Sequence, residues 1–399
     1  MKHTSKNQEQ IARNEAEMLR LIRAKRGLSP AQISRRMNMA PSTVGIYVTR
    51  LKKEGYLTDG EKHEVEGPGR PARDVVINPD AGTFVGVDIT NRFVRMIRMD
   101  FAEEVLQEER EEIQQGRSFD RVMNRIVRLA RSNKGDPPVL GAGVVVPSPV
   151  PDQHLTRGTW RHLREWNLNT VDVVFREEFD VPVHHDTSHR AMAAAELWFG
   201  QGRDVDNFVS LSARTGVGAI PVLDGEPLRG VNDKAGNIGY WKCPPHLLPR
   251  PLSGREESKG LALAELCSIP GFLDQVEQNR AEVPDSVLSE VRGEMMFGDV
   301  LNALRERDGL ATQHRDAAGV ALGWAAARLN ELLDPELFVL SGSIIALGGG
   351  FVEVVRDTLA SQVGPDRTAV PHFAITELGE HAGAIGAAAV ALHHWKPDR

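Results

Sequence analysis

The sequence predicts an α/β protein in two parts, a small helical domain at the N-terminus and a larger body of alternating strands and helices. Three short helix patterns bounded by glycine or proline, followed by a glycine-rich turn, indicate the first part within residues 1–80. Apolar strands that alternate with helical periodicity indicate the second. Charge separates the same parts, because residues 1–80 hold 15 Lys and Arg against 10 Asp and Glu, whereas residues 81–399 hold 33 against 45.

Composition excludes several classes of protein. The 399 residues are 41% hydrophobic and 26% charged, which is typical of a globular protein. The longest apolar run, Leu337 to Val352, is broken by glycines and serines and is too short to span a membrane. The N-terminus lacks the pattern of a secretory signal, and two cysteines are too few for a disulfide framework. We therefore expect a cytoplasmic protein that does not bind a membrane.

The N-terminal domain reads as three helices. The first helix pattern ends at Gly27, and Ser29 and Pro30 have the residue types of an N-cap and a first helical residue. They predict a second helix to Met37, and Pro41 begins a third. Two helices joined by so tight a turn form a helix-turn-helix.

The third helix is the expected DNA-reading element. Val44, Val48 and Leu51 form its apolar face, so other residues face outward and can reach base edges in a major groove. The turn GPGRPAR (67–73) predicts a wing that suits a minor groove. We expect base contacts from Ser42, Thr43 and Tyr47, phosphate contacts from Arg50, Lys52 and Lys53, and wing contacts from Arg70 and Arg73.

The charge distribution agrees with this interpretation. A basic N-terminal domain attracts phosphates, while an acidic body repels nucleic acid and limits non-specific binding. The expected partner is a double-stranded DNA operator. The alternative is a small helical subdomain that serves only as a dimerisation arm.

The body reads as strands and helices in a mixed order. Residues 84–100 predict a hairpin, residues 139–150 a buried strand, residues 181–200 a strand running into a helix, and residues 207–225 two strands joined by a glycine turn. Such an order implies α/β lobes with mixed sheets. A helix over 316–333, rich in Ala, Gly and Leu, serves either the core or a subunit interface.

These segments together resemble one family, the ROK family, named for repressors, open reading frames and kinases. The resemblance covers nearly the whole chain and rests on GPGRPA at Gly67, GVDI at Gly86, GAGVVVPSPV at Gly141, HHDTSHRAMAAAELWFG at His184, LSARTGVGAIPVLDGEPLRGVNDKAGNIGYW at Leu211, LFVLSGSIIALGG at Leu337 and HAGAIGAAAVAL at His381. It implies an actin-like, sugar-kinase-like body of two lobes behind the winged helix-turn-helix. The implied domains are 1–80 for DNA binding, 81–199 with about 380–399 for the first lobe, and 200–379 for the second lobe, which carries the oligomerisation surface.

The resemblance places kinase positions on residues that have changed. Asp186 stands at the position of the family's catalytic base, but His185 and Ser188 replace the two Asn residues around it. Asn237 and Tyr240 stand where the family has Glu and His. We expect no catalytic residue, with Asp186 a vestigial base. The residues expected to bind an effector are Ser148, His185, Asp186, Asn237 and Tyr240.

Neither zinc nor ATP is expected as a cofactor. The family's zinc site uses a His and three Cys, whereas this sequence has Tyr240 and one Cys243 in that region. The family's kinases have glycines after the residue that corresponds to Asp88, where backbone N–H groups approach a phosphate, but no glycine stands in residues 89–92 of this sequence. In the second phosphate turn, Arg214 stands where the family has a glycine. His185 and His189 are four residues apart, so they either share a helix face as metal ligands or line a polar pocket; we expect no metal.

The leading hypothesis is a transcriptional repressor whose kinase-derived body senses a sugar or a sugar derivative. The two-fold symmetry of a palindromic operator implies a homodimer or homotetramer. The alternative is a sugar kinase that phosphorylates a hexose with ATP and carries an appended DNA-binding domain. A third possibility is a DNA-bound scaffold whose degenerate pocket binds no ligand.

Overall fold

The structure, a computed structural model, describes residues 6–63, 72–90, 93–113, 119–131, 136–146, 168–249, 260–363 and 371–397. These residues form two compact units. The first unit holds residues up to 145, 168–186 and those from 384 onward, and the second holds 187–383. The helix that follows residue 187 therefore joins the second unit instead of the first lobe, because it packs on strands of the second unit.

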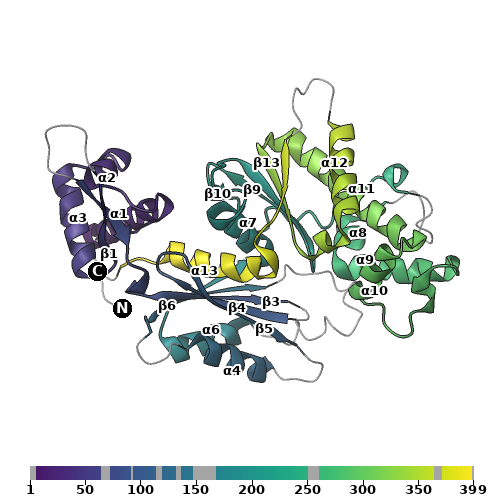
Figure 1. The fold of residues 1–399 in the computed structure, drawn as a ribbon, viewed down its shortest axis with the longest axis horizontal. Helices are drawn as coiled ribbons and strands as arrows, with labels where there is room; N and C mark the ends of the chain where they lie inside the picture. The colour runs from purple at the N-terminus through teal and green to yellow at the C-terminus, as the bar shows by residue number, and fades with distance from the viewer. Residues whose placement is uncertain are drawn as a thin grey trace. The chain divides into compact units, whose positions relative to one another are not determined.

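The N-terminal part of the first unit, residues 6–80 and hereafter the head, has the expected three helices and two-stranded wing (Figure 1). The Ser29 hydroxyl accepts a hydrogen bond from the Gln32 backbone N–H, and the Gln32 side chain accepts one from the Ser29 N–H at 2.8 Å. This capping box fixes the start of the second helix. The elements are α1 (Lys6–Ala24), α2 (Pro30–Arg36), α3 (Pro41–Lys53), β1 (Leu57–His63) and β2 (Ala72–Ile77).

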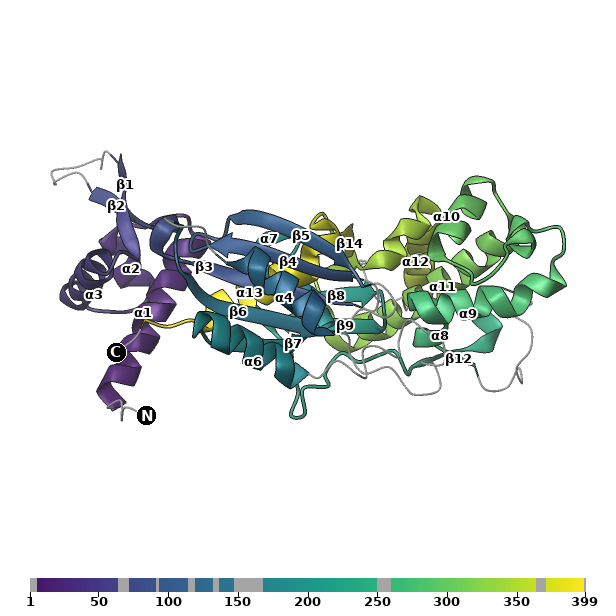
Figure 2. The ribbon, with the colours of Figure 1, turned by 90° about the horizontal axis from the view of Figure 1, so that it is seen from below.

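The first lobe is a five-stranded sheet in the order β5-β4-β3-β6-β7. The predicted hairpin is confirmed, since β3 and β4 pair antiparallel, and β3 pairs in parallel with β6 on its other side. Helix α13 covers one face, and α4 and α6 cover the other (Figures 1 and 2). The elements are β3 (Thr83–Ile89), β4 (Phe93–Asp100), β5 (Val105–Glu112), α4 (Phe119–Ala130), β6 (Val139–Val146), α6 (Leu168–Phe179), β7 (Val183–Thr187) and α13 (Ala382–His394).

Two glycines allow α13 to lie directly on the sheet. A Cβ atom at Gly86 would lie 1.9 Å from the Ala384 carbonyl oxygen, and one at Gly143 would lie 1.8 Å from the Ala387 carbonyl oxygen. Any side chain at either position would force the helix away from the strands. The motifs around Gly86 and Gly143 are thus explained by packing in this lobe.

The second unit has a five-stranded sheet in the order β10-β9-β8-β13-β14. Helix α7 packs on one face of β8 and β9, while the main apolar core joins the other face to α11 and its neighbours. Helix α11 buries 14 of its residues, so the core function expected for 316–333 is confirmed within this unit. The strands are β8 (Phe208–Ala213), β9 (Val217–Leu223), β10 (Glu226–Pro227), β11 (Lys242–Cys243), β12 (Leu261–Ala262), β13 (Leu337–Ser341) and β14 (His372–Ile375). The α-helices are α7 (Ser188–Phe199), α8 (Leu263–Cys267), α9 (Ile269–Asn279), α10 (Phe297–Arg305), α11 (Gly309–Leu333) and α12 (Gly349–Gln362).

Among the helices that the structure describes, none is both long enough and apolar enough to cross a membrane.

Candidate DNA-binding and effector-binding sites

Helix α3 has one face in the core of the head and one face free. Its buried residues are Val44, Tyr47, Val48 and Leu51, whose spacing places them on one side of a helix. The opposite face begins near the N-terminal end of the helix, the end that reads bases in a helix-turn-helix. Its exposed residues are Ser42, Gly45, Ile46, Thr49 and Lys53, and Thr43 is half-buried.

The prediction that Tyr47 faces outward is wrong. The side chain is 8% exposed, and its hydroxyl accepts a hydrogen bond from the Asn14 amide at 3.4 Å. Helix α1 thus covers Tyr47 and holds it in the core. The spacing 44, 47, 48 and 51 is itself that of a single helix face, so the sequence contained the signal.

The expected phosphate-binding cations differ in how they are held. The Arg50 Nε donates to Glu15, a carboxylate with no exposed surface, at 2.6 Å. The Lys52 ammonium pairs with Asp59 at 2.6 Å. Arg50 therefore ties α3 to α1, and Lys52 ties α3 to the wing strand, whereas Lys53 is exposed.

The wing is described only at its base. Arg73 is exposed on β2 and lies 4.0 Å from Asp59, while Arg70 lies outside the described residues. Two cations missed by the sequence analysis, Arg35 and Arg36, are exposed at the end of α2, next to the turn that leads into α3. Two neighbouring arginines at the end of the first helix of the motif could have been identified from the sequence as candidate phosphate contacts.

The expected effector residues of the first unit lie at the end of β7. Asp186 is 8% exposed and His185 is exposed, and Ser148 lies outside the described residues. The His184 ring lies 4.9 Å from the His394 ring of α13. The chain enters the second unit directly after Asp186.

His185 and His189 do not share a helix face, so that possibility is wrong. His185 belongs to strand β7, whereas His189 belongs to α7, where it is 6% exposed and its Nδ1 lies 2.5 Å from the Ser212 hydroxyl. In the parts of the chain that the structure describes, no three His, Cys, Asp or Glu side chains gather as metal ligands would.

The His189 ring lies against the turn that corresponds to a phosphate turn. A Cβ atom at Gly218 would lie 2.4 Å from the His189 ring, so the glycine leaves room for the imidazole. Burial, with the charge of Arg214 added, lowers the pKa of His189 to about 4. A neutral imidazole thus fills space beside β8 and β9, and Arg214 closes the turn through a backbone bond to Gly216.

Asn237 and Tyr240 are exposed in the second unit, in the segment that follows β10. That segment is tied to α7, because the buried Arg190 guanidinium donates to the Asp233 carbonyl oxygen at 2.9 Å and lies 3.6 Å from its carboxylate. Arg190, which the sequence analysis did not single out, therefore positions the segment.

The two thiols do not form a zinc site. Cys243 and Cys267 have no exposed surface and belong to the apolar core of the second unit. Burial raises the pKa of Cys243 to about 12, so the thiolate that a zinc ion needs is disfavoured. The residues described around Cys243 do not fit the metal.

The head and the first lobe meet at an aromatic cluster formed by Tyr56, Phe101 and Trp395. The Trp395 ring centroid lies 4.9 Å from that of Tyr56 and 5.1 Å from that of Phe101. The buried Arg23 of α1 lies over the Phe101 ring, and its Nε donates to the Phe101 carbonyl oxygen at 3.1 Å. Segments from both ends of the chain thus share one core.

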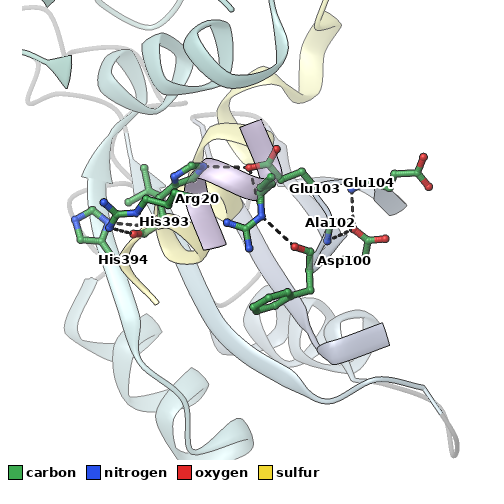
Figure 3. Close-up of polar contacts among 10 residues, drawn as sticks. Arg20, Asp100, Ala102, Glu103, Glu104, His393 and His394 are labelled. Carbon is green, nitrogen blue, oxygen red and sulfur yellow. Dashed lines mark hydrogen bonds and ion pairs between the residues drawn. The ribbon is translucent and has the colours of Figure 1, made fainter. Parts of the chain in front are cut away.

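Figure 3 shows polar contacts that Glu103 and Asp100 make in the first unit. The Glu103 carboxylate lies 3.1 Å from His393 Nε2 of α13 and 3.8 Å from Arg23 Nε of α1. Asp100 points the other way and accepts from the Ala102 and Glu104 N–H groups, both at 2.8 Å. Glu103 therefore joins the head to the last helix of the chain.

Comparison with known proteins matches both parts of the chain. The model of the ROK family matches residues 84–394, and a model described as winged helix-turn-helix DNA-binding matches residues 13–58. The xylose repressor of Bacillus subtilis strain 168 is 22% identical over 390 residues, which cover 96% of this chain and 95% of that protein.

Two kinds of solved structure share the fold. A ROK family transcriptional regulator, a homologue of the E. coli MLC protein, is similar with a TM-score of 0.74 and 22% identity, covering 95% of this chain and 96% of that one. A ROK family glucokinase from Streptomyces griseus, in complex with glucose and AMPPNP, is similar with a TM-score of 0.61 and 20% identity, covering 78% and 99%. The predicted fold, a winged helix-turn-helix ahead of a sugar-kinase-like body, is confirmed.

Proposed function

The chain belongs to the ROK family, and we propose that it is a transcriptional repressor that binds an operator through its head and releases it when a sugar or sugar derivative binds the body. The observation that carries this proposal is the free face of α3, which is exposed at its reading end on a winged helix-turn-helix. The cations Arg35, Arg36 and Lys53 are exposed in the same head and suit DNA phosphates.

The body is proposed to sense its ligand and not to phosphorylate it. His189 fills space beside the β8–β9 turn, and the Arg214 side chain stands at the turn itself, where small residues would let backbone N–H groups approach a phosphate. Asn237 and Tyr240 offer neither the carboxylate nor the imidazole that the family's kinases use. Zinc and ATP are accordingly not proposed as cofactors.

The residues proposed to contact the effector are His185, Asp186, Asn237 and Tyr240. A carboxylate and an amide are good partners for sugar hydroxyls. The full-length similarity to a xylose repressor supports a sugar as the ligand class.

Helix α13 is the proposed route from ligand to DNA. It begins at Ala382, where the chain passes from the second unit to the first. At its other end, Trp395 packs on Tyr56 of the head, and the His393 carbonyl oxygen accepts a hydrogen bond from Arg20 of α1. A ligand that favours one arrangement of the units would act on the head through this helix.

An operator selection tests the proposal. The purified protein is mixed with fragments of its source genome at moderate salt, and the retained fragments are sequenced. Enrichment of a palindromic site is expected, since a homodimer or homotetramer presents two heads. No enrichment at any salt concentration would refute DNA-specific binding.

An ATP-turnover assay with a panel of sugars tests the kinase alternative, which Asp186 at the end of β7 favours. No sugar-dependent ADP release is expected. The Asp186→Ala variant should keep operator affinity and lose the response to the effector, and Asp186→Asn separates the loss of charge from the loss of the side chain. Loss of operator binding in Asp186→Ala would show that the residue is misassigned.

A further inference from the structure

The exposed face of α3 carries two neighbouring residues, Gly45 and Ile46, that neither folding nor packing requires. Ile46 is 63% exposed, and no other large apolar side chain in the described part of the head is exposed. Gly45, its neighbour, lies in the middle of the helix and is exposed as well. Both lie among the first six residues of α3, in the half that enters a major groove.

Gly45 has no role in folding that the structure reveals. Its backbone is helical without a positive φ, and no atom lies within 4 Å of the place where a Cβ atom would stand. Alanine would therefore fit, and glycine is among the least favourable residues in a helix interior. A glycine that neither a turn nor packing requires is typical of a place where a ligand approaches the backbone closely.

Ile46 cannot read a base by hydrogen bonding, because its side chain has no polar atom. In the major groove the C5 methyl of thymine is the apolar feature that distinguishes one base from the others. The head also bears the exposed cations Arg35, Arg36 and Lys53, which favour an anionic ligand over an apolar protein surface. A single exposed isoleucine is also too small for a protein interface.

We propose that Gly45 and Ile46 form a thymine-reading site, in which Ile46 contacts the C5 methyl of one thymine in each half-site and Gly45 allows the backbone to approach the bases. The proposal names the base feature that the head recognises, and it rests on the proposed function only in requiring DNA as the ligand. Ser42 and Thr49 lie along the same exposed face and supply hydroxyls for polar contacts beside this site.

The test uses the selected operator with thymines replaced one position at a time by deoxyuridine, which lacks only the C5 methyl. Wild-type protein should lose roughly three- to tenfold in affinity at one symmetric position of the two half-sites, the effect of removing one buried methyl contact. Because this arm uses the unaltered protein, no folding defect can produce the result. Equal affinity for every substituted operator would overturn the proposal.

Two variants complete the test. Ile46→Ala removes the contact in both half-sites, so it should lose roughly that factor once for each half-site on the thymine operator. It should show no further loss when deoxyuridine replaces the contacted thymine, the signature of a coupled pair. Gly45→Ala should raise the unfolding temperature and lower operator affinity, opposite signs that a purely structural role would not give. Leu106→Ala, which truncates an exposed side chain on β5 of the first lobe, is the matched control and should keep full thymine discrimination.

The outcomes separate this proposal from the proposed function. If no operator is enriched, the regulator hypothesis fails before this test begins. If an operator is enriched but Ile46→Ala keeps the wild-type discrimination between thymine and deoxyuridine, the thymine-reading site is wrong and the regulator hypothesis stands. If Gly45→Ala keeps full affinity, the close approach at Gly45 is wrong.

Discussion

Helix α3 of the head and helix α7 of the second unit differ in the exposure of their side chains. In α3 the side chains Ser42, Ile46 and Thr49 are exposed. In α7, which follows Asp186, His189 and Arg190 are buried and bonded within the unit. Helix α3 thus exposes one of its faces, while α7 uses its polar side chains for contacts within the second unit.

The head therefore has an exposed helix face, whereas the polar side chains at the start of α7 stabilise the second unit itself. The body keeps the strand order and the close approach of α13, which depend on Gly86 and Gly143. The residues that change chemistry are side chains at the ends of strands, whose replacement leaves the sheet intact.

The largest expected effect concerns His189. Its pKa lies below the ordinary 6.5, so the folded state favours the neutral ring, and the stabilisation is present above pH 6.5 and lost as the pH falls toward 4. The loss should approach roughly 3 kcal/mol. Unfolding free energies measured by urea between pH 7 and pH 4 should fall less steeply in His189→Gln than in wild type. His246→Gln, at an exposed site, is the control, and a slope unchanged in His189→Gln would show that the ring is not desolvated.

Arg50→Ala tests whether the cations of α3 belong to folding or to DNA. It leaves the buried Glu15 carboxylate without its guanidinium partner, which should cost roughly 2 kcal/mol of stability. Thermal unfolding of the purified variant measures the loss. Lys52→Ala removes an ion pair with an exposed Asp59 and should change stability much less than Arg50→Ala does, because solvent screens an exposed pair. Equal losses in both variants would contradict the distinction.

Trp395→Ala tests the contact between the head and α13. Removing a partly buried indole from the aromatic cluster should lower the free energy of unfolding by roughly 2 kcal/mol, less than a fully buried aromatic would. The variant should also respond less to the effector while still binding the operator. Lys396→Ala, the exposed neighbour, is the control, and an unimpaired response in Trp395→Ala would remove α13 from the proposed route.

Lys53→Ala should have the smallest effect. The exposed ammonium makes no contribution to the core, so stability should stay within about 0.5 kcal/mol. Operator affinity plotted against salt concentration should lose roughly one ion from its slope. A wild-type slope would remove Lys53 from the phosphate contacts.

The sequence predicted the head well because its signals are local. Ser29-Pro30 and Pro41 mark helix starts that the structure places at the same residues. The outward orientation of Tyr47 was wrong because only three of the four residues on the apolar face were counted. The ion pair of Arg50 with Glu15 joins residues 35 apart, and no local pattern predicts such a contact.

The body was predicted less completely, for two physical reasons. Strand β5 was missed because its sequence, VLQEEREE, ends in a run of charged residues, as suits the exposed edge of a sheet. The positions of His189 and Arg190 depend on long-range contacts with Ser212 and Asp233, which no local sequence pattern predicts.

We propose that the body senses a sugar and the head reads DNA, and that the protein transfers no phosphoryl group. The most direct measurement is the affinity of the full chain for its selected operator across a panel of sugars and sugar phosphates, each with and without ATP, with ADP release followed in the same samples. We expect one ligand to lower operator affinity to the same extent with and without ATP, and we expect no ADP to form. Sugar-dependent ADP release, with operator affinity unaffected by every ligand, would contradict it.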